Sequence, residues 1–129
     1  MIISIDFDGT IVYESWPEPG AVFPNAREVI NELYEKGHTI VINTCRSGKH
    51  EGVAQDVLEN NNINYHWINT NVPDLIHKYG MDCRKISADV YIDNKQLGGL
   101  PTIPHSEVID WLMVRELLDK EFNLNLDNI

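Results

Sequence analysis

Cysteine is scarce in this sequence of 129 residues, where only Cys45 and Cys83 occur, far apart in the chain. Two separated cysteines provide neither a disulfide framework nor a zinc cluster, so we expect reduced thiols and a cytoplasmic location. No apolar run approaches the roughly 18 residues of a transmembrane helix, and the N-terminus lacks the basic and apolar regions of an export signal. We therefore expect no membrane association.

Basic residues are also few: 10 Lys plus Arg stand against 20 Asp plus Glu, which gives a formal net charge of -10. This charge repels nucleic acids and anionic membranes, and no basic run offsets it. A phosphorylated small molecule is a compatible ligand, but an acidic protein would need a cation to neutralise its own site. Hydrophobic residues make up 43% of the chain, enough for the core of a single domain over residues 1–129.

Apolar and β-branched runs alternate with helical patterns along the chain. Asn25 followed by Glu28 predicts a helix N-terminus with a capping box, and Gly37 suits the end of that helix. Pro73 and Gly80 bound a short helix. The predicted strands cover residues 1–5, 39–43, 65–68 and 88–92. Two further helices are marked by Val53, Ala54, Val57 and Leu58, and by Ile109, Leu112, Met113 and Leu117.

Alternating strands and helices predict an α/β fold in which a parallel sheet lies between layers of helices, a three-layer, doubly wound, Rossmann-like arrangement. Ligands bind such sheets beyond the carboxyl ends of the strands. Asp6 and Asp8 follow the first predicted strand, Thr44 follows the second, and Asp93 follows the fourth. We therefore expect these four side chains to converge at one edge of the sheet.

These residues also carry a family resemblance. The stretch "DFDGT" at 6–10, "NTCR" at 43–46, Lys85, and "ADVYIDN" at 88–94 resemble, in this order, the four motifs of the haloacid dehalogenase (HAD) superfamily. The resemblance covers residues 1 to about 100. Within the superfamily, the sequence is most similar to small phosphatases without a cap domain and to nucleotidase-like members. It implies a HAD-like fold and a phosphatase activity.

The resemblance implies that Asp6 attacks phosphorus to form an aspartyl-phosphate, while Asp8 protonates the leaving oxygen and later activates water. The chemistry agrees, since a carboxylate nucleophile divides hydrolysis into two displacements and the second needs a nearby base. Gly9 permits the tight bend that aims Asp8 back at the site, and we count it with the substrate-binding residues. A polar turn at a strand end is the alternative for the two acids.

The loop after the second strand is expected to bind phosphoryl oxygens. Thr44 offers its hydroxyl and the neighbouring backbone N–H groups to a charge that spreads over three oxygens. Arg46 is either a bidentate phosphate ligand or a surface charge. Cys45 belongs to the same substrate-binding loop, and its side chain is expected to be a small buried filler rather than a nucleophile.

The resemblance also implies a cation and a metal site. Lys85, just before Ser87-Ala88-Asp89, is expected to bridge nucleophile and phosphate, with Arg84 and Lys78 as competitors for this role. Asp93, a carboxylate oxygen of Asp6 and the backbone carbonyl of Asp8 would hold Mg²⁺, which prefers oxygen ligands. Many family members carry a second acid where this chain has Asn94, which removes one negative charge from the site.

Family members usually gain specificity from a cap domain inserted after the first or the third strand. The corresponding gaps here, residues 11–24 and 70–87, are too short for one. An open site accepts bulky substrates or is closed by a partner subunit, so homo-oligomer formation is compatible with the sequence. Trp16, in the first gap, is expected either to cover the leaving group of the substrate or to pack the loop onto the domain.

The sequence thus predicts a Mg²⁺-dependent phosphatase that hydrolyses phosphomonoesters of a small-molecule substrate. One alternative is a phosphoacceptor domain resembling response-regulator receivers, but these place the acceptor after the third strand, where Ile68-Asn69 offers no acid. The other is a catalytically weak or silent binding domain, which Asn94 favours. Against it, a pure binder has little need of Asp8 as a general acid.

Overall fold

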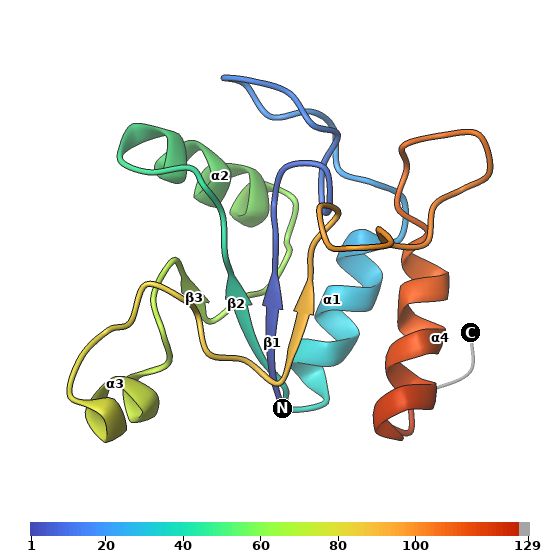
Figure 1. The fold of residues 1–129 in the computed structure, drawn as a ribbon. Coiled ribbons are helices and arrows are strands. Elements are labelled where there is room, and N and C mark those ends of the chain that lie inside the picture. Colours follow the sequence, from blue (N-terminus) through green and yellow to red (C-terminus); the bar gives the residue numbers. More distant parts are fainter. Residues whose placement is uncertain (127–129) are drawn as a thin grey trace.

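Four short parallel strands form the sheet in a computed structural model that describes residues 1–126 (Figure 1). They are β1 (Ile2–Ile5), β2 (Thr39–Ile42), β3 (Trp67–Ile68) and β4 (Val90–Ile92), in the order β3-β2-β1-β4. All neighbouring strands are parallel, with Ile5 opposite both Ile42 and Ile92. The predicted α/β architecture is confirmed, and β1, β2 and β4 end level with one another at one edge.

The helices are α1 (Ala26–Glu35), α2 (Lys49–Asn60), α3 (Pro73–Tyr79) and α4 (Trp111–Phe122). The predicted capping box at the start of α1 is wrong, because Asn25 makes no side-chain cap hydrogen bond. Its backbone is left-handed, with φ 67°, whereas a capping residue needs an extended backbone to aim its side chain at the first turn. No helix in residues 1–126 has the length and apolar character needed to cross a membrane.

The C-terminal helix presents a different face from the one predicted. Ile109 is buried but precedes α4, and Leu112, Met113 and Leu117 are about two-fifths exposed. The helix begins after Asp110, whose side chain accepts a hydrogen bond from the Met113 N–H. Because the helix starts there, a different stripe of residues at helical spacing faces the core. It consists of Trp111, Val114, Arg115 and Leu118.

One face of the sheet carries the core. Ile3, Ile5, Ile40 and Ile42 join buried residues of α1, α2 and α4 in a single apolar cluster. Because side chains alternate along a strand, Ser4 and Val41 point to the opposite face. There Tyr91, opposite Ser4, donates a hydrogen bond to the carbonyl of buried Ile86.

The expected third layer is thin, since none of the residues of α3 is buried. Right-handed crossovers explain this asymmetry. The chain moves in one direction from β1 to β2 to β3, so α1 and α2 fall on the same face. The opposite face is covered by the segment that leads back to β4.

Candidate functional site

A pocket of about 490 Å³ lies at the carboxyl ends of β1, β2 and β4. Its lining comes from Asp6 and Asp8 after β1, from residues 14–16, from residues 44–46 after β2, and from residues 93–95 after β4. The predicted convergence is confirmed, because the ends of β1, β2 and β4 at Ile5, Ile42 and Ile92 lie level in the sheet and the chain after each of them lines one cavity. Two of the predicted site residues, Gly9 and Lys85, do not line this pocket.

Asp6 is the most perturbed acid of the pocket. Burial, followed by repulsion from Asp93, raises the pKa of Asp6 from 3.8 to about 7. Hydrogen bonds from Thr10 and the Phe7 backbone oppose this rise, and Asp8 adds a smaller repulsion. A carboxylate in this position is costly without a compensating cation, and such strongly shifted groups are typical of functional sites.

The turn after Asp8 is locked to the end of β4. Gly9 has φ 80°, and a Cβ there would lie 2.4 Å from Asn94 Nδ2, so a side chain would collide with Asn94. The Thr10 hydroxyl donates to Asp6 Oδ2 (2.9 Å) and accepts from the Asn94 backbone N–H (3.0 Å). Beneath the turn, the buried Trp111 indole donates to the Thr10 carbonyl at 2.9 Å. Gly9 therefore shapes the site, and Asn94 serves as a packing and hydrogen-bonding partner of the turn.

Arg46 is neither of the two alternatives that the sequence left open. It is fully buried, and its Nε and Nη2 donate to the two carboxylate oxygens of Asp8 at 2.7 and 2.9 Å. Its guanidinium also donates to the carbonyls of Ser15 and Pro17, and lies over the rings of Phe7 and Trp16. Arg46 thus holds residues 15–17 and Asp8 together. The sequence does not reveal this role, because Asp8 lies 38 residues away from Arg46.

Thr44 is held in place by a residue that sequence reasoning missed. The Asn69 carbonyl oxygen Oδ1 accepts from the Thr44 N–H, and Nδ2 donates to the Arg46 carbonyl and to Glu51. The Thr44 hydroxyl accepts from the Arg46 N–H at 3.1 Å. A hydroxyl that accepts in this way keeps its own proton to donate to a ligand oxygen. The signal for Asn69 was its place directly after a strand.

Lys85 lies away from the pocket, contrary to the prediction. It is exposed, and its ammonium lies 5.4 Å from the centre of the Tyr91 ring. The reason is its position before β4, whereas the pocket forms after the strands have ended. The competitors Arg84 and Lys78 are exposed on the same connecting segment and also do not line the pocket.

The pocket rim contains an ion pair that the sequence did not single out, together with Trp16 and Cys45, which it did. Lys95 Nζ lies 3.6 Å from a carboxylate oxygen of Glu14, and both side chains are largely exposed. Trp16, 65% exposed, also packs against the ring of His50 at the start of α2. Cys45, expected to be buried, is exposed in the lining. Cys45 stands at a bend after β2, next to the buried Arg46.

The donor set of the pocket suits a hard divalent cation. Within residues 1–126 no group of three or more His, Cys, Asp or Glu side chains is arranged to hold a metal. Because Arg46 occupies the carboxylate of Asp8, the side-chain donors are Asp6 and Asp93, and the Asp8 carbonyl is the predicted third ligand. Two carboxylates, a carbonyl and waters fit Mg²⁺, which binds few protein ligands and keeps several waters.

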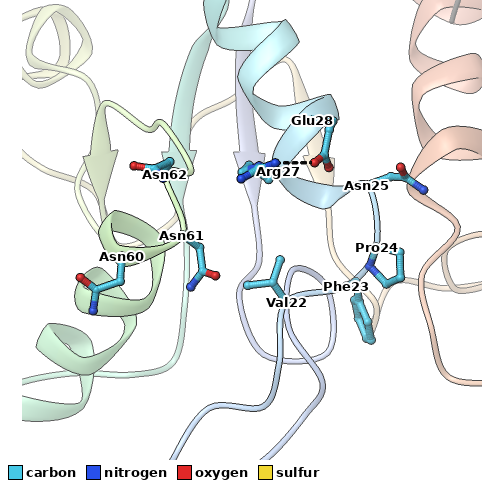
Figure 2. Close-up of a pocket in the computed structure, with 9 residues that line it drawn as sticks. All are labelled: Val22, Phe23, Pro24, Asn25, Arg27, Glu28, Asn60, Asn61 and Asn62. Carbon is cyan, nitrogen blue, oxygen red and sulfur yellow. Dashed lines mark hydrogen bonds and ion pairs between the residues drawn. The ribbon is translucent and has the colours of Figure 1, made fainter.

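A second cavity lies between the start of α1 and the end of α2 (Figure 2). It measures about 290 Å³ and is lined by neutral polar groups such as Asn25 and Asn62 and by the Arg27–Glu28 ion pair. None of the predicted site residues lines it. This second cavity therefore adds nothing to the site expected from the sequence.

Comparison with protein-family models and with curated proteins finds no match for this chain. A solved structure of a conserved protein from Bacteroides thetaiotaomicron is similar, with 29% sequence identity and a TM-score of 0.79. The similarity covers 94% of this chain and 91% of that chain. It supports the α/β fold over nearly the whole length and attaches no activity to it.

Proposed function

We propose that this protein is a phosphomonoester phosphatase of the HAD type, with Asp6 as the nucleophile. The observation that carries the proposal is the meeting of Asp6, Asp8, Thr44 and Asp93 in one pocket at the carboxyl ends of three neighbouring strands. The resemblance of "DFDGT" to the first HAD motif agrees with it. A cytoplasmic location is part of the proposal, supported by two free, exposed thiols that suit a reducing compartment.

In the first step an oxygen of Asp6 forms a bond to phosphorus while the bond to the leaving oxygen breaks. Thr10 holds Oδ2 of Asp6, which orients the other oxygen as the nucleophile. Asp8 gives its proton to the leaving oxygen. Thr44 donates its hydroxyl proton to an oxygen of the transferring group, where negative charge is spread.

In the second step Asp8 takes a proton from water as the water oxygen attacks phosphorus. The phosphorus–oxygen bond to Asp6 breaks, which releases phosphate and restores the carboxylate. Arg46 donates to both carboxylate oxygens of Asp8 and so holds this side chain in place within the pocket.

Asp6, Asp93 and the Asp8 carbonyl would hold Mg²⁺ in this mechanism. The cation supplies positive charge that offsets the repulsion between the carboxylates and the phosphoryl group. The raised pKa of Asp6 supports a cation, since its causes, burial and Asp93, are those that a nearby positive charge counteracts.

The test is hydrolysis of a panel of phosphate esters, beginning with an aryl phosphate, in the presence of Mg²⁺. We expect turnover by the wild-type protein, its loss in Asp6→Asn, and its loss when a chelator removes the cation. A matched control is Asp74→Asn, which changes an exposed acid of α3 in the same way. Equal inactivity of wild-type and Asp6→Asn over the whole panel would sink the proposal.

The second candidate is a catalytically weak or silent phosphate-binding domain. Asn94, which stands where many HAD members have an acid and instead binds Thr10, favours it. The variant Asp8→Asn separates the two candidates. Measurable turnover that disappears in this variant excludes the silent domain, whereas phosphate binding without turnover in either protein supports it.

A further inference from the structure

The proposed reaction places a negatively charged phosphoryl group among three carboxylates, those of Asp6, Asp8 and Asp93. Two cationic side chains, Arg46 and Lys95, line the pocket. A positively charged side chain that contacts the phosphoryl group would stabilise its negative charge, in addition to any bound cation. The two side chains differ in how many of their N–H donors are free to supply it.

Arg46 is almost fully committed within the fold. Of the five N–H donors of an arginine, two bind Asp8, one binds Ser15 and one binds Pro17. The group is buried beneath the ring of Trp16, so reaching a ligand would require it to leave Asp8 and two carbonyls. Arg46 therefore neutralises Asp8 rather than the substrate.

The ammonium of Lys95, in contrast to the guanidinium of Arg46, is not committed within the fold. Its side chain is 71% exposed, and it pairs with Glu14 at 3.6 Å, longer than the roughly 2.7–2.9 Å of a strong charge-assisted hydrogen bond. Exposed pairs of this kind contribute little to stability, so exchanging one anion for another costs little. The lysine also follows Asp93 and Asn94 directly, at the end of the strand that carries the proposed metal ligand.

We propose that Lys95 is the cation of this site, and that its ammonium leaves Glu14 to bind the phosphoryl oxygens of the substrate. The inference rests on the proposed function and deepens it. It assigns to Lys95 the part that the sequence resemblance had given to Lys85. Glu14 then competes with the substrate for Lys95, and it weakens substrate binding in the resting protein.

The kinetic test compares five variants of the full chain on an aryl phosphate with Mg²⁺. We expect Lys95→Ala to lower kcat/KM by about ten- to hundredfold, the range of one charge-assisted contact, and Lys95→Arg to restore part of it. Glu14→Gln should lower KM, because it removes the competing carboxylate. Lys120→Ala, at an exposed site on α4, is the matched control. A loss in Lys85→Ala with none in Lys95→Ala would overturn the inference.

Binding of inorganic phosphate, measured by calorimetry with Mg²⁺ present, separates this inference from the proposed function. Weaker binding in Lys95→Ala and tighter binding in Glu14→Gln support the role of Lys95, even for a protein that shows no turnover. Wild-type turnover together with unchanged kinetics and phosphate affinity in Lys95→Ala overturns the role of Lys95 and leaves the phosphatase standing. Circular dichroism of each variant establishes that it is folded.

Discussion

Two ion pairs meet at the same pocket and differ in burial and in length. In the Arg46–Asp8 pair the side chains are 1% and 22% exposed and the closest N–O distance is 2.7 Å. In the Lys95–Glu14 pair they are 71% and 59% exposed and the distance is 3.6 Å. The buried pair is part of the framework, because each partner would be left uncompensated without the other. The exposed pair is held loosely, so its charges are available to a ligand.

The largest effect should come from breaking the buried pair. Arg46→Ala leaves Asp8 and the carbonyls of Ser15 and Pro17 without their donor, and should cost about 3 kcal/mol of unfolding free energy. Urea unfolding measures this loss. Arg27→Ala, which removes the cation of the exposed pair with Glu28, is the control and should change stability by less than about 0.5 kcal/mol. Equal losses in the two variants would contradict the framework role.

The next effect concerns Asp6, the acid beside these pairs, which forms no ion pair with an arginine or lysine within residues 1–126. With a pKa of about 7 in the folded protein against an ordinary value of 3.8, Asp6 holds a proton that the unfolded chain releases. Stability therefore falls as the pH rises from about 4 to 7. Asp6→Asn removes this penalty and should stabilise the protein by about 2 kcal/mol at pH 7.5, with little gain near pH 4.

Thermal unfolding between pH 4 and pH 8 measures the Asp6 effect, with Glu107→Gln, an exposed acid, as the matched control. Adding Mg²⁺ should raise the Tm of the wild-type protein and narrow its difference from Asp6→Asn, because a cation relieves the repulsion. A gain from Asp6→Asn that is the same at every pH would speak against a buried, titrating carboxyl as its cause.

A smaller loss should follow from loosening the loop that presents the buried arginine. Asn69→Ala removes the acceptor of the Thr44 N–H and the donor to the Arg46 carbonyl, and should cost about 2 kcal/mol. Asn62→Ala is the matched control, since both asparagines have a left-handed backbone, with φ 54° and 56°. The difference between the two variants in urea unfolding isolates the side-chain hydrogen bonds; no difference would show that they contribute nothing.

The smallest effect should come from the exposed pair. Glu14→Gln should change the unfolding free energy by less than about 0.5 kcal/mol, since the pair is open to water and screened by salt. The same urea experiment measures it. A loss as large as that of Arg46→Ala would erase the distinction between the two pairs.

The meeting of Asp6, Thr44 and Asp93 could be predicted because it depends on local patterns. Each residue follows an apolar run, and parallel strands bring such positions to one edge. The place of Lys85 could not be predicted in this way, because a residue before a strand has no fixed relation to the edge beyond it. Its contact with Tyr91 is a property of the folded segment alone.

Neither the partner of Arg46 nor the buried face of α4 could be predicted from the sequence. An ion pair across 38 residues depends on how the loop after β2 lies against the turn after β1. In α4 the sequence offers two overlapping apolar stripes, and the start of the helix at Trp111 decides between them. Tertiary packing, rather than the periodicity, made that choice.

The hydrogen bond from the Trp111 indole to the Thr10 carbonyl has a consequence for biosynthesis. The turn that positions Asp6 and Asp8 is made early in the chain, yet its underside is completed by α4, the last helix of the fold to be synthesised. A nascent chain therefore lacks a finished pocket until α4 has left the ribosome. If the proposed phosphatase activity is correct, chains that end before α4 should not hydrolyse phosphate esters.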